Sequence, residues 1–142
     1  MSEFRWNEAK SILCADKIGE GQNRKVYVCR LDPDWVVKLE PRGTHFQNIE
    51  EWRAWWWAEG TPKARWLAPC RFISPCGFIL MQRRVTPMRN GERPKRLPDW
   101  LGDLKPENFG VMDGKVVACD YGTILSSFRD RRTVMTKAEW RT

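Results

Sequence analysis

A polar segment and the hairpin predicted directly after it constrain the fold of this chain more than any other feature. Residues 102–108 read Gly-Asp-Leu-Lys-Pro-Glu-Asn. Two β-rich runs follow at 109–112 and 115–119, and the Asp-Gly pair between them is typical of a type I′ hairpin turn. Residues 120–122 then read Asp-Tyr-Gly. We therefore expect a β-hairpin that is flanked by two polar turns.

The two polar turns resemble two motifs of the protein-kinase-like family, whose reaction is phosphoryl transfer. That reaction needs a carboxylate near the attacking hydroxyl, a cation near the moving phosphate, and an amide oxygen plus a second carboxylate to hold Mg²⁺ against the triphosphate. The protein-kinase-like family carries these groups in a catalytic loop that reads Asp-Leu-Lys-Pro-Glu-Asn and in a metal-binding triplet, usually Asp-Phe-Gly, across a β-hairpin. Residues 103–108 and 120–122 resemble that loop and that triplet.

The resemblance implies a role for each polar residue. Asp103 is the base or orienting group for the acceptor hydroxyl, and Lys105 contacts the phosphate. Asn108 and Asp120 are the ligands of Mg²⁺. Polar turns that merely cap strand ends would explain each residue alone. Six consecutive matching residues and a triplet in its expected context favour the kinase-like interpretation.

The N-terminal half contains a segment that resembles the glycine-rich loop of the same family. Residues 18–26 read Ile-Gly-Glu-Gly-Gln-Asn-Arg-Lys-Val. By the resemblance, Gly19 and Gly21 let backbone amides approach the phosphates of ATP, and Val26 covers the adenine. Arg24 replaces the third glycine, so it either contacts phosphate or fills the space that a nucleotide needs. A plain turn between two strands would also carry Gly-x-Gly.

A lysine in a predicted apolar strand provides the next match. Residues 35–39 read Trp-Val-Val-Lys-Leu and resemble the strand whose lysine neutralises the α- and β-phosphates and is held by a helix glutamate. Lys38 is the expected phosphate lysine, although an isolated strand lysine is usually an edge residue. Glu51 is the first choice for its partner and Glu50 the second, because adjacent helix residues point about 100° apart and only one can face the sheet.

The same resemblance assigns the adenine site to residues 78–83, which would form the fifth strand and the hinge. Met81 would lie near the adenine, and the backbone of Gln82 and Arg83 would meet its edge. An ordinary core strand with a polar end would look the same.

Hydrophobic patterning predicts an α+β fold with a five-stranded antiparallel sheet and one helix. The helix is expected at 49–59 with Asn48 as its cap, and it places Trp52, Trp55, Trp56 and Ala58 on the packed side and Trp57 off it. Residues 84–99 are basic and interrupted by proline, so a loop or a short irregular helix is expected there. The strands are expected at 11–18, 25–30, 35–39, 66–73 and 77–81.

The chain departs from the family most in its length of 142 residues. Residues 84–102 are too few for the long helices that normally support the catalytic loop, and residues 123–142 leave no room for a helical substrate subdomain. The loop also begins Leu-Gly-Asp rather than His-Arg-Asp, which removes a support for Asp103. We expect one kinase-like domain, with residues 11–83 as N-lobe and hinge and residues 84–142 as a severely reduced C-lobe.

Composition narrows the class of partner and compartment. Lys and Arg number 25 against 18 Asp and Glu, and the formal net charge of +7 favours anionic partners such as nucleotide phosphates, nucleic acid or acidic protein surfaces. The five cysteines lack C-x-x-C spacing and His45 is the single histidine, so we expect buried, reduced thiols and no zinc site. No apolar run matches a membrane span or a signal peptide, which predicts a cytoplasmic protein without a membrane partner.

The expected function is ATP- and Mg²⁺-dependent transfer of the γ-phosphate to a hydroxyl of a protein, or of the chain itself. The alternative is a weakly active or inactive kinase-like module that binds and modulates a host or partner protein through exposed Trp and Arg side chains. Nucleic-acid binding is a third interpretation, and it rests only on charge and on the nine tryptophans. Compact kinase-like chains of this kind resemble small phage or prophage products.

Overall fold

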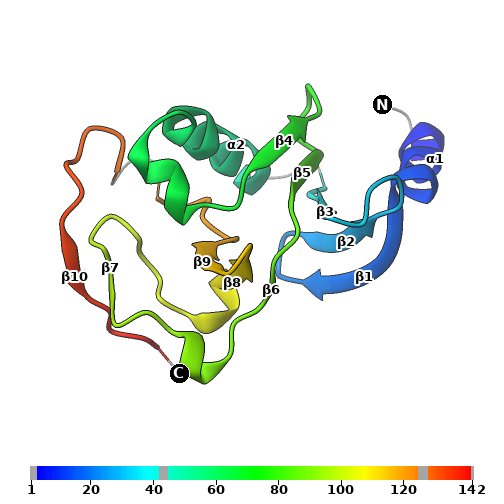
Figure 1. The fold of residues 1–142 in the computed structure, drawn as a ribbon. Coiled ribbons are helices and arrows are strands. Elements are labelled where there is room, and N and C mark those ends of the chain that lie inside the picture. Colours follow the sequence, from blue (N-terminus) through cyan, green and yellow to red (C-terminus); the bar gives the residue numbers. More distant parts are fainter. Residues whose placement is uncertain (1–2, 42–44, 125–127, 142) are drawn as a thin grey trace. The chain divides into compact units, whose positions relative to one another are not determined.

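The structure is a computed structural model that describes residues 3–41, 45–124 and 128–141 (Figure 1). The described chain divides into two compact units. The first unit contains the chain up to Asn48 and the segment Cys70–Arg84, and the second contains Ile49–Pro69 and the chain from Val85 onward. Each unit is therefore built from segments that are separated in the sequence.

The first unit is a five-stranded antiparallel sheet with one α-helix before it. The sheet order is β1-β2-β3-β5-β4, so the third strand lies at the centre. This confirms the predicted α+β class and the predicted five-stranded antiparallel sheet. The elements are α1 (Glu3–Leu13), β1 (Cys14–Glu20), β2 (Lys25–Cys29), β3 (Trp35–Leu39), β4 (Cys70–Ile73) and β5 (Ile79–Arg83).

Helix α1 was not predicted, because residues 11–18 were expected to form one strand. The helix continues to Leu13, and Ser11 donates from its hydroxyl to the carbonyl oxygen of Glu8 at 2.9 Å, as a helical serine can. The strand begins only at Cys14, which packs into the core of the sheet with Val37 and other buried residues. The first predicted strand was therefore wrong over its first three residues, 11–13.

Helix α2 (Gln47–Ala58) begins one residue before the predicted cap, so Asn48 lies inside the helix. The carboxylate of Glu40 caps it instead, because it accepts the backbone N–H groups of Gln47 at 2.9 Å and of Asn48 at 2.8 Å. The Asn48 side chain is buried and donates to the carbonyl oxygens of Lys38, Gly77 and Phe78 at 3.0, 2.9 and 3.2 Å.

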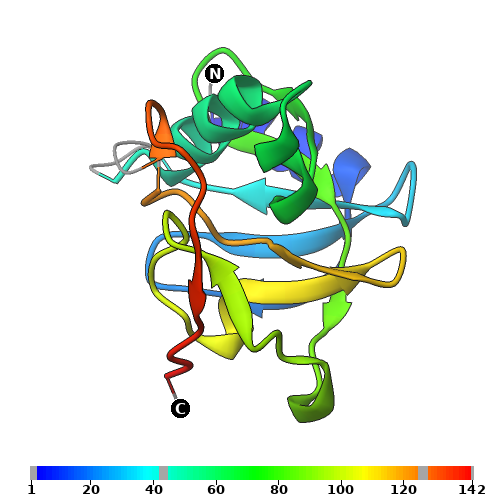
Figure 2. The same ribbon diagram turned by 60° about the vertical axis from the view of Figure 1, so that its left-hand side comes forward.

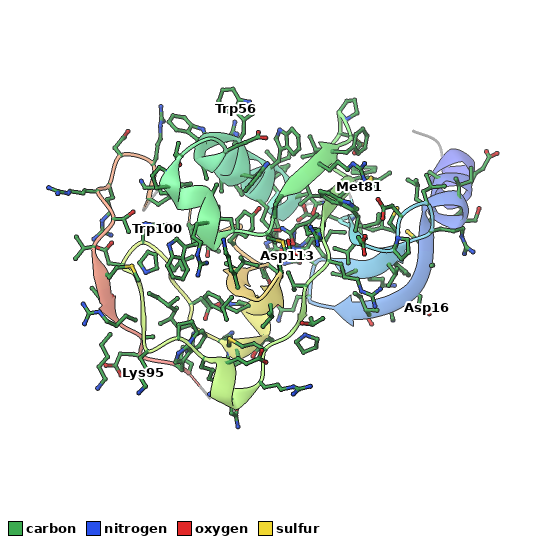
Figure 3. All side chains as sticks on the ribbon, in the orientation of Figure 1. Asp16, Trp56, Met81, Lys95, Trp100 and Asp113 are labelled. Carbon is green, nitrogen blue, oxygen red and sulfur yellow. The ribbon has the colours of Figure 1, made fainter. Side chains whose placement is uncertain are left out.

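The packed side of α2 agrees with the prediction for Ala58, which is buried, and for Trp57, which is exposed, but differs for Trp56. Its buried residues Glu51, Ala54 and Ala58 recur at helical spacing, whereas Trp56 is 66% exposed and Trp57 36% exposed. Trp56 extends away from the helix in Figure 3. The small alanine side chains allow close packing on this face, and this places the bulky indole rings on the flanks of the helix.

The second unit contains the predicted hairpin. Its strands are β8 (Phe109–Met112), as predicted, and β9 (Lys115–Ala118), which ends one residue before the predicted end. Strand β8 pairs with β9, and Met112 lies opposite Lys115. Asp113 and Gly114 between them have φ values of 51° and 77°, which a type I′ turn requires. The elements are η1 (Pro62–Trp66), β6 (Thr86–Pro87), η2 (Asn90–Glu92), β7 (Arg96–Pro98), η3 (Pro106–Asn108), β8 (Phe109–Met112), β9 (Lys115–Ala118) and β10 (Met135–Lys137).

Short strands also form where none were predicted. Strand β6 extends the hairpin sheet to the order β6-β8-β9, and β7 pairs with β10, whose polar sequence carries no strand signal (Figures 1 and 2). Gly110 on β8 makes the β6 contact possible. A Cβ atom at this position would lie 2.7 Å from Cβ of Val85 and 2.8 Å from the carbonyl oxygen of Thr86.

The cysteine prediction holds for three residues and fails for two. All five thiols are free, and Cys14, Cys29 and Cys70 are buried, but Cys76 is exposed and Cys119 is half-buried. In the part of the chain that the structure describes, no group of three or more His, Cys, Asp or Glu residues could hold a metal ion. No helix among the described residues has the length and apolar character that crossing a membrane requires.

Candidate functional site

The polar loop of the second unit is organised around Asp103. This residue adopts a left-handed backbone conformation with φ of 49°, which a non-glycine residue rarely adopts. Its carbonyl oxygen accepts the backbone N–H of Lys105 at 2.7 Å and the side-chain amide of Asn108 at 3.0 Å. The same amide donates to the Asp103 carboxylate at 3.2 Å, so one side chain fixes both the backbone and the carboxylate.

The end of the hairpin folds back onto this loop. The carbonyl oxygen of Asn108 accepts the backbone N–H of Cys119 at 2.8 Å and of Asp120 at 3.2 Å. The hairpin thus brings the backbone of Asp120 to the residue that also holds Asp103. Of the residues predicted for catalysis and metal binding, the structure assembles Asp103, Lys105, Asn108 and Asp120 in the second unit.

The Asp103 carboxylate lies between two cations. Nζ of Lys105 lies 4.0 Å from Oδ2, and Nη1 of Arg141 lies 2.7 Å from Oδ1. All three side chains are partly exposed, with 41% of the Asp103 side chain accessible. Sequence reasoning missed Arg141, because it is far from the loop in the sequence and belongs to no recognisable motif.

Buried contacts support the loop from both sides. Tyr121 of the Asp-Tyr-Gly triplet is buried and donates from its hydroxyl to the carbonyl oxygen of Ala68 at 2.7 Å. The backbone N–H of Ala68 donates to Ala118 at the end of β9, at 2.8 Å. Phe109, directly after Asn108, is buried as well. Asp103 and Asp120 are therefore exposed and Lys105 and Asn108 half-buried, whereas Phe109 and Tyr121 beside them are anchored in the core of the unit.

No family model and no curated protein matches the chain.

The predicted glycine-rich loop is the hairpin between β1 and β2 in the first unit. Gly19 lies opposite Val26, and the backbone N–H of Gly21 donates to the carbonyl oxygen of Arg24 at 2.8 Å, which closes the turn. Glu20 between the glycines pairs with Lys17 at 2.9 Å. The hydrogen bond and charge of Lys17 lower the pKa of the Glu20 carboxyl.

Arg24 points into the first unit. Its side chain is buried, with 6% of the residue exposed, and Nη1 donates to Oδ1 of Asn48 at 3.1 Å. Asn48 is held in turn by its bonds to main-chain carbonyl oxygens and by the Glu40 cap of the helix. Arg24, Asn48 and Glu40 therefore form a buried polar cluster where α2 begins.

The predicted lysine and glutamate are both buried charged residues. Lys38 is 4% exposed on the central strand β3, opposite Val26 on one side and Leu80 on the other. Glu51 is buried on α2, whereas Glu50 is half-exposed and pairs with Arg53 at 3.6 Å. Buried charges need polar partners, and such positions are typical of a functional group rather than of a solvated surface charge.

The predicted adenine site lies on β5. Met81, labelled in Figure 3, is half-buried and lies opposite Val37. Gln82 lies between β3 and β4, opposite Val36 on one side and Cys70 on the other, so its backbone is inside the sheet. Arg83 is the last residue of β5. Arg83 also pairs within the sheet, because it lies opposite Trp35 on β3.

Proposed function

We propose that this chain is an ATP- and Mg²⁺-dependent phosphotransferase of the protein-kinase-like class with a reduced C-lobe. The observation that carries the proposal is the Asp103 loop. Asn108 holds the carboxylate and backbone of Asp103, and the hairpin returns Asp120 to Asn108. Three residues that phosphoryl transfer needs are thus assembled from two segments of the chain. The five-stranded sheet that carries Lys38 is consistent with a nucleotide-binding upper lobe.

Asn108 and Asp120 offer donors that fit Mg²⁺, because hard cations prefer amide and carboxylate oxygens. Since Nδ2 of Asn108 donates to Asp103, Oδ1 is the atom that can ligate a cation. Asp120 is exposed. Bound Mg²⁺ and ATP would supply the phosphoryl group to be transferred.

The remaining residues act on the acceptor and on the charge that develops. Asp103 orients the acceptor hydroxyl and accepts its proton, while Lys105, whose Nζ lies 4.0 Å from the Asp103 carboxylate, offers a cation to the transferred phosphate. Lys38 binds the other phosphates of ATP. The acceptor is a protein hydroxyl, or one of the chain's own.

Phosphate transfer from radiolabelled ATP tests this function directly. The wild type with Mg²⁺ should label itself or an added protein substrate, and Asp103→Asn or Asp120→Ala should reduce the rate about 10²-fold or more. Glu107→Gln is the matched control, because Glu107 is an exposed carboxylate of the same loop with no assigned role. Undiminished labelling in Asp120→Ala, or none in the wild type, would contradict the proposal.

The second candidate is a kinase-like module that binds a partner protein and transfers little or no phosphate. Exposed aromatic and basic side chains on the second unit favour it. Trp56 and Trp57 meet edge to face with centroids 6.4 Å apart, and the guanidinium of Arg129 lies 3.8 Å from the Trp57 ring. Exposed Trp and Arg side chains are enriched in protein interfaces. The burial of Arg24 in place of the third glycine points the same way.

Thermal unfolding with and without nucleotide separates the two candidates. A ligand that binds only the folded state stabilises it by about 2.7 kcal/mol at 100 times its dissociation constant. The phosphotransferase should therefore unfold at a higher temperature with millimolar ATP and Mg²⁺, and Lys38→Ala should lose the shift. An unchanged transition would favour the binding module.

A further inference from the structure

The segment 131–141 runs along the residues that precede the Asp103 loop and ends on the loop itself. We propose that this segment holds the loop in place, and that Arg141 is a positioning residue for Asp103. The positioning role rests on the proposed phosphotransfer, whereas the holding of the loop can be measured independently of activity.

The first step is the pairing of this segment with residues 95–99. Strand β10 is antiparallel to β7, with Met135 opposite Pro98 and Lys137 opposite Arg96. The pairing is extended at both ends, since the backbone N–H of Asp99 donates to Val134 at 2.8 Å and that of Ala138 donates to Lys95 at 2.9 Å. Arg131 adds an ion pair to the Asp99 carboxylate at 2.9 Å. The segment is therefore anchored before it reaches the loop.

Trp140 provides the second anchor. Its indole N–H donates to the carbonyl oxygen of Pro94 at 2.9 Å, and its ring meets the Phe109 ring edge to face with centroids 5.0 Å apart. Phe109 is buried and directly follows Asn108. Trp140 thus packs against Phe109, the residue that directly follows Asn108.

Arg141 makes two hydrogen bonds to the loop. Its backbone N–H donates to the carbonyl oxygen of Leu104 at 2.9 Å, and Nη1 donates to Oδ1 of Asp103 at 2.7 Å. An exposed ion pair between two mobile side chains contributes little, because both lose conformational freedom. Here the backbone of Arg141 is already fixed, so only its side chain loses conformational freedom when the ion pair forms.

Asp103 needs such support. Its left-handed backbone conformation is disfavoured for a residue with a side chain, and neighbouring contacts must over-determine it. Asn108 holds one carboxylate oxygen and Arg141 holds the other. Without Arg141, the carboxylate can rotate away from Asn108. A displacement of about 1 Å at a reacting group is enough to reduce a rate about 10²-fold.

The experiment compares Arg141→Ala, Arg141→Lys and Lys137→Ala in the full chain. Lys137 is the matched control, because it is a cation of the same segment whose side chain is exposed and pairs only weakly with Glu139 at 4.0 Å. The first readout is the hydrogen-exchange rate of the backbone N–H groups of Lys105 and Asn108. The second is the kcat and KM of phosphate transfer. Near-UV circular dichroism checks that each variant is folded.

Arg141→Ala should accelerate exchange at these amides about 10-fold and lower kcat about 10- to 10²-fold with an unchanged KM for ATP. Arg141→Lys should recover part of both, and Lys137→Ala should match the wild type. Unchanged exchange in Arg141→Ala overturns the holding of the loop, and an unchanged or raised kcat overturns the positioning role. A wild type that transfers no phosphate overturns the phosphotransfer and, with it, the positioning role. If exchange is nevertheless faster in Arg141→Ala, the proposal that the segment holds the loop is still supported.

Discussion

The side-chain amide of Asn108 bonds both the carbonyl oxygen and the carboxylate of Asp103, at 3.0 and 3.2 Å. This pair makes the six-residue turn 103–108 into a rigid unit, because the side-chain amide of Asn108 fixes both the backbone and the side chain of Asp103. The carbonyl oxygen of Asn108 then binds the backbone of Asp120. Asn108 is the common point of contact for the two polar turns that the sequence places on either side of the hairpin.

Asn108→Asp should distinguish the hydrogen bonds that Asn108 donates to Asp103 from its proposed role as a metal ligand. The variant keeps an oxygen ligand but loses both donors and places a second carboxylate beside Asp103, so like charges repel. We expect a loss of stability of about 1–3 kcal/mol in urea unfolding and a strong loss of phosphate transfer. Glu107→Asp, in the same loop, should change stability by less than about 0.5 kcal/mol. An Asn108→Asp variant as stable as the wild type would show that the two bonds do not hold the loop.

Gly110→Ala should destabilise the hairpin sheet of the second unit. A methyl group there would meet Cβ of Val85 at 2.7 Å and the carbonyl oxygen of Thr86 at 2.8 Å, and a backbone atom cannot easily move away. Such overpacking costs about 1–3 kcal/mol of the free energy of unfolding. Gly91→Ala is the matched control, since its Cβ would meet nothing within 4 Å. Equal stabilities of the two variants would refute the close approach of β6 to β8.

Glu40→Gln should weaken the start of helix α2. The carboxylate accepts the N–H groups of Gln47 and Asn48 and places negative charge at the helix N-terminus, whereas a glutamine carries no charge and has one oxygen. We expect a loss of about 0.5–2 kcal/mol by chemical denaturation. Glu50→Gln removes an acidic residue that pairs at the surface with Arg53, and it should cost less. The reverse order would exclude Glu40 as the cap.

Cys76 should be the first thiol to react with iodoacetamide near neutral pH. Partial burial raises the pKa of this thiol, but hydrogen bonds from Ser74 and from the backbone of Phe78 and Cys76 outweigh it and lower the pKa from 9.0. Its rate should fall as the pH drops through that lowered pKa, because the thiolate is the nucleophile. Peptide mass spectrometry after timed labelling measures the rate at which Cys76 reacts, and Ser74→Ala should lower that rate. Preferential labelling of Cys14 would contradict the prediction.

Cys14 should reduce the stability of the fold at alkaline pH. Burial raises the pKa of its thiol above 9.0, so above that pH the unfolded chain releases a proton that the native state keeps. Stability contributed by the neutral thiol is therefore present below pH 9 and is lost as the pH rises further. The free energy of unfolding of Cys14→Ala should fall less steeply above pH 9 than that of the wild type. Parallel curves would show that this thiol does not contribute.

Local chemistry made much of the fold predictable. The Asp113-Gly114 turn, strand β3 and the sheet class follow from turn residues and from apolar, β-branched runs, and these act within a few neighbouring positions. Elements with weak local signals were missed. The polar strand β10 exists because its backbone pairs with β7, and the N-terminal helix was hidden by a run that also suits a strand.

The sequence by itself determined the polar loop, the hairpin and the class of the sheet, because turn preferences and hydrophobic alternation are properties of short segments. It did not determine every strand boundary, since β1 begins at Cys14 and β4 at Cys70 rather than at the predicted residues 11 and 66. Only the tertiary structure decided that Arg141 meets Asp103, that Trp140 packs on Phe109, and that Arg24 turns inward to Asn48. These contacts join residues far apart in the chain. No local pattern encodes them, since they depend on how the strands pair and on which side chains the packed core leaves within reach.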